Sequence, residues 1–347
     1  MRNVTVSVII PCRNEEGFIA KTLDSIINSD YDMNDVEILV VDGMSDDKTR
    51  EIVTAFTQEY AMIKLIDNPQ RTVPYAMNYG IEASSGDVIV RLDAHSIYPK
   101  NYISELVYWL KKLNVENVGG VWDTTAANDS LEAQAVAYST AHPFGIGDAQ
   151  YRISEKTEPY EVDTVPFGCY RRDVFDKIGL FDTDLTRNQD DELNARLIEN
   201  GGRIFLIPTL HITYFARENF SKLFKMFYQY GYFKPLVNLK LKKPATLRQF
   251  VPPLFVLFLF FGVLSFFFSK VLFSLFVVML FVYFALDVSV SYKLAKEHKN
   301  MKLLPYLATS FFLIHFAYGY GYLKGIVDFV FLKKHRKKDL RAVNISR

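Results

Sequence analysis

The sequence has few of the residues that mark disulfide-rich or zinc-binding proteins. Among 347 residues there are only two cysteines, Cys12 and Cys169, and neither has a CxxC or CxxH neighbour. They provide no zinc signature and no disulfide framework, so a reducing compartment is expected. The formal net charge is only +1, which argues against a nucleic-acid partner.

Glycine-rich phosphate loops are also absent. No GxGxxG follows the first apolar run, and GxxxxGK[ST] occurs nowhere in the chain. Such loops hold dinucleotides and nucleotide phosphates through backbone N–H groups. Their absence excludes a dinucleotide fold and a P-loop. A nucleotide site in this chain must therefore use carboxylates, other side chains and a metal.

Short apolar runs alternate with helical periodicity in the first hundred residues. Strands are expected at 4–10, 36–41, 62–66 and 88–92, with Pro11 ending the first. Strands that alternate with helices form βαβ units, so we expect an α/β fold with a mainly parallel central sheet. Ligands bind such sheets at the carboxyl ends of the strands.

The stretch DVIVRLDAHS at 87–96 ends one of these strands in polar side chains. Asp93 and His95 are two residues apart, so in an extended chain they point to the same side. A carboxylate oxygen and an imidazole nitrogen suit Mn²⁺ or a similar cation, which could neutralise a diphosphate. The alternative is a strand that exits into a polar turn.

Several further segments occur in a fixed order with this one. They read SVIIPCRNEE, VVDGMSDD, NPQRTVPYAMNYGIEASSGDVIVRLDAHS and VDTVPFGCYRRDVFDKIGLFDTDLTRNQDDELNARLIENGGRI. In this order they resemble family 2 glycosyltransferases, which have the GT-A fold. The resemblance covers roughly residues 5–235. Within the family, the DAHS, NQDDE and YQYGYFKP strings are most similar to the membrane-bound glucosyltransferases of succinoglycan biosynthesis.

The resemblance implies a donor site for a nucleotide sugar. In this family the loop after the first strand and the aspartate after the second hold the base and ribose. The corresponding residues here are Pro11, Arg13, Asn14, Glu15 and Asp42. Asp93 is also expected to bind the nucleotide sugar, and Arg71 is expected to contact the nucleotide or a phosphate.

The resemblance also implies a metal site. The family's metal-binding DxD reads Asp93-Ala94-His95 here, and the imidazole in the third position favours Mn²⁺ over Mg²⁺. His211, in PTLHITYF, is a further candidate metal ligand. Its alternative is a packed or hydrogen-bonded histidine.

The family's acceptor-side motif, E-D-x-D/E-L-x-x-R, reads QDDELNAR at 189–196, so Gln189 replaces the first acid. By position Asp190 is the catalytic base, with Asp191 as the alternate. An inverting transfer needs a carboxylate to take the proton of the acceptor hydroxyl. Adjacent acids repel one another, which raises the pKa of at least one. The alternative is a helix N-terminus whose acids complement the dipole.

The last hundred residues contain long apolar stretches. Residues 250–269 carry no charge, which matches the ~20 residues needed to cross a bilayer. With 271–292 they predict a hairpin, and 303–332 is expected to form a broken pair or a re-entrant and interfacial element. The apolar run at the N-terminus is too short for a signal peptide, so a cytoplasmic head is expected. The expected division is a GT-A domain at 1–235, a basic membrane-surface linker at 236–249, membrane-embedded helices at 250–332 and a basic cytoplasmic tail at 333–347.

The resemblance thus implies a metal-dependent, inverting hexosyltransferase of the cell membrane, multi-pass, with its catalytic domain on the cytoplasmic face. The expected donor is a UDP-sugar, of glucose or a related hexose, and the expected acceptor is a polyprenyl-linked oligosaccharide in capsule or exopolysaccharide biosynthesis. Membrane lipid is a further partner, because confinement at the bilayer raises the effective concentration of such an acceptor. The alternatives are transfer to polyprenyl phosphate itself, or an inactive head that serves as a platform for other polysaccharide-assembly proteins.

Overall fold

The computed structural model describes residues 4–153, 156–244 and 246–337. The chain divides into two compact units, Met1–Asp123 with Gln150–Tyr214, and Thr124–Ala149 with Phe215–Arg347. The division differs from the expected boundary at residue 235, because 124–149 and 215–235 group with the C-terminal helices. Of the expected tail at 333–347, residues 338–347 lie outside the described residues.

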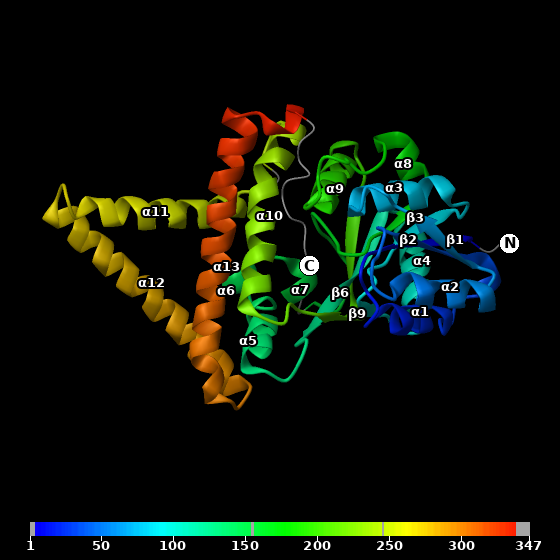
Figure 1. The fold of residues 1–347 in the computed structure, drawn as a ribbon, viewed down its shortest axis with the longest axis horizontal. Helices are drawn as coiled ribbons and strands as arrows, with labels where there is room; N and C mark the ends of the chain where they lie inside the picture. Colours follow the sequence, from blue (N-terminus) through cyan, green and yellow to red (C-terminus); the bar gives the residue numbers. More distant parts are fainter. Residues whose placement is uncertain (1–3, 154–155, 245, 338–347) are drawn as a thin grey trace. The chain divides into compact units, whose positions relative to one another are not determined.

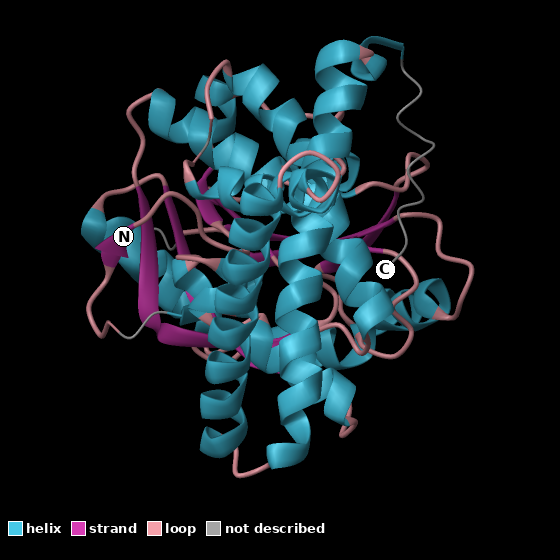
Figure 2. Ribbon diagram, turned by 90° about the vertical axis from the view of Figure 1, so that its left-hand side faces the viewer, coloured by secondary structure: helices cyan, strands magenta, loops and turns pink. Residues whose placement is uncertain are grey.

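In the described part of the chain, the strands form a nine-stranded sheet with the order β3-β2-β1-β4-β8-β6-β9-β5, and β7 pairs with β9 (magenta in Figure 2). The strands are β1 (Val6–Cys12), β2 (Val36–Asp42), β3 (Ile63–Asp67), β4 (Val88–Arg91), β5 (Ser96–Ile97), β6 (Asn117–Thr125), β7 (Tyr160–Glu161), β8 (Cys169–Arg171) and β9 (Ile204–Phe215). Strands β1 to β4 pair in parallel, whereas β8 pairs antiparallel with β4 and with β6. The predicted α/β fold is therefore confirmed.

Successive residues of β1 face opposite layers of helices. Val8 and Ile10 pack in one apolar cluster with Leu23 of α1, whereas Ile9 packs in another with Met77 of α3. Because both faces of the sheet are covered, the parallel strands read as continuous apolar runs. The helices of this unit are α1 (Ile19–Ile27), η1 (Met33–Asp35), α2 (Thr49–Glu59), α3 (Val73–Ala83), α4 (Tyr102–Leu113), α7 (Gln150–Ile153), α8 (Asp173–Ile178) and α9 (Gln189–Glu199).

The prediction that Pro11 ends the first strand is wrong. Strand β1 continues to Cys12, with Pro11 opposite Val41 and Cys12 opposite Asp42. The ladder to β4 has already ended at Ile9, and a residue without an N–H group is tolerated where a ladder ends. As a result β1 and β2 end level, which brings the loops that follow them together.

The second unit is helical. It contains α5 (Leu131–Ser139), α6 (Pro143–Ile146), α10 (Phe220–Leu241), η2 (Arg248–Phe250), α11 (Val251–Ser265), α12 (Lys270–Glu297), η3 (Met301–Leu303), α13 (Leu304–Gly325), η4 (Ile326–Phe331) and η5 (Lys334–Lys337). Glycines let α10 and α13 touch: a Cβ on Gly231 would lie 2.0 Å from the Tyr318 carbonyl oxygen, and one on Gly321 would lie 2.1 Å from that of Tyr228. Close backbone approach at small residues is typical of helix pairs in membranes.

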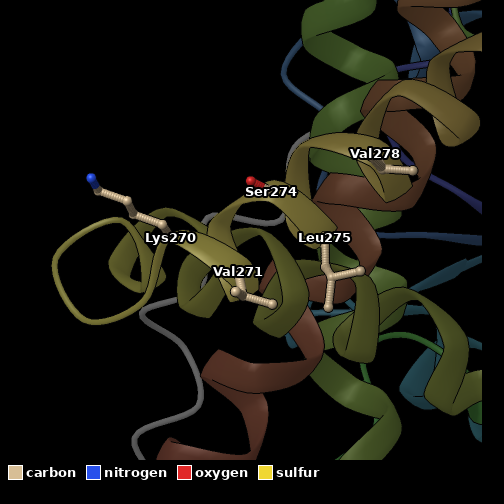
Figure 3. Close-up of a pocket in the computed structure, with 5 residues that line it drawn as sticks. All are labelled: Lys270, Val271, Ser274, Leu275 and Val278. Carbon is tan, nitrogen blue, oxygen red and sulfur yellow. The ribbon is translucent and has the colours of Figure 1, made fainter.

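Helices α11 and α12 diverge from α13 (Figure 1). Among the described residues, two segments are long and apolar enough to cross a membrane, Arg248–Ser265 with mean hydropathy 1.6 and Lys270–Glu297 with 2.5. In the most apolar 18-residue window of each segment, only 17% and 11% of the residues are buried, so most of their apolar side chains are exposed. A hollow along α12 is lined mainly by apolar side chains, and Lys270 points away from the helix at its start (Figure 3).

The break expected within 303–332 is absent. Helix α13 runs to Gly325 and continues directly as the π-helix η4. Asp328 in η4 is buried and accepts hydrogen bonds from Tyr232 Oη and Lys324 Nζ, each at 2.9 Å. Lys334 Nζ lies 2.9 Å from the same carboxylate. These contacts hold η4 against α10, so Lys324 and Asp328 are paired within a continuous helix.

Candidate active site

The candidate site lies in the first unit, at the carboxyl ends of the parallel strands. The loops that follow β1 and β2 are joined there by hydrogen bonds. The Asn14 N–H donates to Ser45 Oγ (2.9 Å), and Asn14 Oδ1 accepts from the Asp46 N–H (3.1 Å). Asn14 adopts φ +55°, a left-handed conformation that asparagine tolerates. The sequence RNEE therefore forms a fixed loop edge and not a flexible connection.

Asp42 lies beneath this edge and is fully buried. Its carboxylate accepts from the Ser45 N–H (3.0 Å) and Oγ (2.5 Å), and it pairs with Arg50 Nη1 (2.7 Å). Arg50 also reaches Asp67 at the end of β3 (2.8 Å). In this state Asp42 holds the loop after β2, and the Asp42 carboxylate is shielded from solvent.

Two arginines predicted for the donor site converge on Gly43. A Cβ at Gly43 would lie 3.3 Å from Arg13 Cβ and 3.4 Å from Arg71 Cα. Within the described part of the chain, Arg13 Nε is buried without a hydrogen-bond partner. Arg71 is exposed and adopts φ +61°. The structure therefore brings two cationic side chains to the edge formed by β1 and β2.

Asp93 and His95 follow β4 in a tightly held turn. The Asp93 N–H donates to Tyr98 Oη (2.8 Å), and the Ala94 carbonyl accepts from Thr22 Oγ1 (2.9 Å). The Asp93 side chain is 20% exposed and that of His95 is 15% exposed. His95 Nδ1 lies 3.7 Å from Glu15 Oε1, so the loop after β1 also meets this turn.

His211 does not join this group. Its Nδ1 lies 2.9 Å from Asp123 Oδ1, and both side chains are more than half exposed. Across residues 4–153, 156–244 and 246–337, no three or more histidine, cysteine or acidic side chains are grouped closely enough to hold a metal ion. Asp93 and His95 therefore offer a two-ligand arrangement.

Asp190 and Asp191 lie in the first turn of α9. The preceding Asn188 has φ +60°, which turns the chain sharply into the helix. Farther along the helix, Glu192 binds Arg196 through two contacts of 2.8 Å. Arg196 in turn donates to the carbonyls of Ile178 and Leu180. Within the acidic motif, Glu192 therefore anchors α9, whereas Asp190 and Asp191 lie at the N-terminal end of this helix.

Arg91, which the sequence analysis did not single out, connects the two halves of the site. Its Nη2 lies 3.1 Å from Asp93 Oδ1, and its Nη1 is paired with Asp190 Oδ1. The Arg91 side chain is only 8% exposed. The detectable signal was an arginine inside the otherwise apolar strand DVIVRLD, two residues before Asp93 and therefore on the same face.

The surroundings of Asp190 tune its acidity. Burial raises the pKa of Asp190, Arg91 opposes this, and the neighbouring charges of Asp93 and Asp191 add to the rise, so the pKa lies above its usual value. For Arg91, burial lowers the pKa, but Asp190 and Asp93 more than compensate, and the net direction is upward. Arg91 therefore remains charged, and Asp190 is a stronger base than an ordinary aspartate.

Aromatic side chains lie near Asp191. Trp122 stacks on Tyr214 with ring centroids 4.0 Å apart, and the Arg152 guanidinium carbon lies 4.2 Å from the Trp122 centroid. Tyr151 packs edge-on against Trp122. Burial raises the pKa of Tyr151, the charge of Arg152 lowers it, and the charge of Asp191 raises it, so the net direction is upward.

The profile of the family described as glycosyl transferase family 2 matches residues 7–179. The chain belongs to this family. The matched region contains the loops after β1, β2 and β4, and therefore every residue predicted for the donor site. Helix α9 with Asp190 lies beyond it. The family resemblance seen in the sequence is confirmed.

Two curated relatives of this family 2 chain match most of its length. It is 29% identical over 332 residues to the dolichyl N-acetyl-alpha-D-glucosaminyl phosphate 3-beta-D-2,3-diacetamido-2,3-dideoxy-beta-D-glucuronosyltransferase of Methanococcus voltae, covering 93% of this chain and 97% of the relative. It is 28% identical over 247 residues to the succinoglycan biosynthesis protein ExoA of Rhizobium meliloti, covering 71% and 73%. The second match agrees with the predicted likeness to succinoglycan enzymes.

A solved structure confirms the predicted GT-A fold. The mannosyltransferase PcManGT from Pyrobaculum calidifontis, solved in complex with GDP-Man and Mn²⁺, superposes with a TM-score of 0.60 at 18% identity. The superposition covers 94% of this chain and 88% of that chain, so the similarity includes both the α/β unit and helical segments.

Proposed function

We propose that this family 2 chain transfers a hexose from a UDP-sugar to a hydroxyl group of a polyprenyl-linked glycan, with inversion at the anomeric carbon. The observation that carries the proposal is the Arg91 bridge. It places the donor-side carboxylate of Asp93 next to a second carboxylate, Asp190, which is 30% exposed and has a raised pKa. Inverting transfer requires this pairing of a diphosphate site with a base.

The donor would bind along the edge formed by β1, β2 and β4. Arg13 and Arg71 converge on Gly43 and supply positive charge for a diphosphate. Pro11 lies at the end of β1, and the following loop with Asn14 and Glu15 is held against the loop after β2 and the start of α2, so these residues would form a rigid surface for the nucleobase and ribose. A contact between Asp42 and the nucleotide would require Ser45 or Arg50 to release this buried carboxylate.

A divalent metal fits at the end of β4. Asp93 and His95 are partly exposed, adjacent, and held by the turn through Tyr98 and Thr22. They would hold the ion with one oxygen and one nitrogen ligand, a set that favours Mn²⁺ over Mg²⁺. When bound, the ion supplies charge that stabilises the leaving diphosphate. His211 is not needed for this arrangement, because its imidazole is paired with Asp123.

The chemical step assigned to this chain is proton removal by Asp190. The acceptor oxygen attacks the anomeric carbon, its proton passes to the Asp190 carboxylate, and the electron pair of the breaking C–O bond leaves with the diphosphate. The raised pKa suits this task, because a base gains driving force as its pKa approaches the working pH. Asp191, which follows Asp190 in the first turn of α9, is the alternate base.

The helical unit supports a lipid-linked acceptor. The exposed, apolar α11 and α12 would insert into the cell membrane as a multi-pass anchor, and η4, whose Asp328 pairs with Lys324 and Lys334, would lie at the cytoplasmic interface. Confinement to one membrane raises the effective concentration of enzyme and acceptor. The name of the Methanococcus relative also describes transfer to a dolichyl-phosphate-linked sugar. A role in capsule or exopolysaccharide assembly follows from this reading.

The test is a transfer assay with the full chain in nanodiscs. UDP-, GDP- and dTDP-hexoses and hexuronic acids are offered with Mn²⁺, Mg²⁺ or a chelator, and the acceptors are polyprenyl phosphate and polyprenyl-phosphate-linked N-acetylglucosamine. We expect mass-shifted product from a UDP-sugar on the sugar-bearing lipid, dependent on metal and lost in Asp190→Asn. Product on polyprenyl phosphate alone would replace the proposed acceptor. Nucleotide binding without product on either lipid would favour an assembly platform.

A further inference from the structure

Arg91 is the feature of the candidate site that the proposed reaction does not yet explain. It ends a strand whose four residues are all buried, and its side chain is only 8% exposed. A guanidinium in such a place is strongly destabilising unless its charge is paired. Its two partners are the carboxylates of Asp93 and Asp190, which the proposed reaction places on the donor and acceptor sides.

The geometry of the bridge is specific. One terminal nitrogen, Nη2, lies 3.1 Å from Asp93 Oδ1, and the other, Nη1, is paired with Asp190 Oδ1. The two carboxylates come from elements far apart in the chain, the end of β4 and the first turn of α9. Arginine presents its donors in a rigid planar fork, so one guanidinium fixes the separation of both acids.

The backbone of Arg91 is held in place by its neighbours in the sheet. Arg91 pairs with Ile9 in the parallel ladder between β1 and β4. Its N–H donates to the Gly168 carbonyl (3.0 Å) at the start of β8. The sheet therefore fixes the backbone of Arg91. Helix α9 is anchored separately, by the contacts of Glu192 with Arg196 and of Arg196 with the Leu180 carbonyl. A side chain held this way can orient a reacting group to the accuracy that catalysis needs.

We propose that Arg91 is the positioning residue of the catalytic base. It holds Asp190 by Oδ1 and so turns Oδ2 toward the acceptor hydroxyl, and through Asp93 it sets the distance between the base and the donor diphosphate. This inference rests on the proposed function, since it takes Asp190 as the base. Arg91 itself touches neither the transferred sugar nor the acceptor in this scheme.

Two substitutions distinguish the effect of the Arg91 charge from the effect of its geometry. Arg91→Lys keeps the positive charge but replaces the rigid planar fork with a flexible ammonium group, so it no longer fixes the separation of the two carboxylates. We expect kcat to fall about 10- to 100-fold in Arg91→Lys, and further in Arg91→Met, because small misplacements of a reacting group cost about this much. The KM for the donor should change less than threefold in Arg91→Lys, because Asp93 keeps its charge partner.

The deciding experiment is a double-mutant cycle on the full chain in nanodiscs, with single-turnover rates for Arg91→Met, Asp190→Asn and the double variant. If Arg91 acts through Asp190, the double variant turns over no more slowly than Asp190→Asn alone. Rate losses that multiply in the double variant would overturn the inference, as would an unchanged rate in Arg91→Met. If Arg91→Met does not fold, Arg91→Lys combined with Asp190→Asn completes the same cycle.

Control variants distinguish a failure of the role of Arg91 from a failure of the proposed function. Arg172 is a partly buried arginine beyond the other end of β4, where it donates to the Gly86 carbonyl and to Ser84 Oγ (2.8 Å). Arg172→Met should keep the wild-type rate per folded molecule. UDP binding with Mn²⁺, measured by calorimetry without acceptor, should persist in Arg91→Lys. Full activity in Asp190→Asn would refute the base assignment, whereas an inactive Asp190→Asn with a fully active Arg91→Lys and Arg91→Met would refute only the role of Arg91.

Discussion

Two partly buried carboxylates, Glu37 at the amino end of β2 and Asp190 beside the carboxyl end of β4, have opposite surroundings. At the amino end, Glu37 accepts hydrogen bonds from Ser7 Oγ (2.7 Å), from the Ser85 N–H (2.5 Å) and Oγ (3.0 Å), and from Lys64 Nζ (3.2 Å). Burial raises the pKa of Glu37, but these donors more than offset it and bring the pKa to about 2. The ionised carboxylate is fully satisfied there.

At the carboxyl end the supply of donors is short. Asp93 and Asp190 share one guanidinium, and Asp191 adds a further negative charge nearby. Burial raises the pKa of Asp190 and Arg91 compensates only in part, so the ionised form remains costly. A carboxylate with surplus donors stabilises the fold, whereas one with too few can exchange a proton. The comparison assigns a stabilising role to Glu37 and a chemical role to Asp190.

The largest effect should come from removing the base at the reactive end. Asp190→Asn keeps the shape of the side chain but cannot take a proton, so kcat should fall by about 10²- to 10⁴-fold. Asp190→Asn also leaves the buried Arg91 with a single carboxylate partner, so thermal unfolding is measured beside the transfer assay and the loss of kcat is expressed per folded molecule. A larger loss of kcat in Asp191→Asn would move the base to Asp191.

The next effect concerns the imidazole that replaces the second acid of the DxD motif. His95→Ala removes one of the two proposed ligands, so the Mn²⁺ concentration needed for half-maximal UDP binding should rise on the order of 10- to 100-fold or more. Binding of UDP at saturating Mn²⁺ should recover in part. The matched control is His211→Ala, which removes an exposed histidine paired with Asp123. An equal change in both variants would argue against a metal role specific to His95.

Part of the candidate site could be predicted from the sequence alone. Local patterns predicted the parallel strands and the placement of Asp93 and His95 at a strand end, because burial and alternation act over a few residues. The bridge from Arg91 to Asp190 could not be predicted in the same way, since it depends on how α9 docks against β4 across 99 residues of sequence. The arginine within an apolar strand indicated that a partner for its charge exists, but not which residue this partner is.

The helical unit shows a second limit. Apolar length predicted α11 and α12, but segment 124–149 gave no sign that it would pack with helices more than 150 residues away. Ala135 of α5 lies in one cluster with Leu307 and Phe311 of α13. Similarly, the broken pair or re-entrant element expected at 303–332 was inferred from the basic clusters around it, whereas the structure continues α13 into η4 and pairs Asp328 with Lys324 and Tyr232. Tertiary pairing of charges overrode the local pattern.

A smaller effect is expected at the stabilising end of the sheet. Glu37→Gln removes an ionised acceptor and should lower the free energy of unfolding by about 1–3 kcal/mol, while the rate per folded molecule stays unchanged. The pKa of Glu37 is lowered from 4.5 to about 2, so its contribution is fully present above pH 4.5 and is lost as the pH falls toward 2. Denaturant unfolding from pH 7 to pH 3 should therefore show a flatter acid dependence in the variant. A loss of activity per folded molecule would mean that the two ends are coupled.

The smallest effect returns to the reactive end and tests whether neighbouring charge tunes the base. The proposed reaction needs ionised Asp190, so kcat/KM should fall as the pH drops through its raised pKa. Asp191 contributes to that rise, so Asp191→Asn should move the acidic limb of the pH–rate profile to lower pH, with kcat near neutral pH changing only a few-fold. Asp191→Glu keeps the charge and should leave the limb near its wild-type position. If the limb in Asp191→Asn stays in place or moves to higher pH, the acidic limb does not report the proton on Asp190, and the contrast between the two ends of the sheet loses its kinetic support.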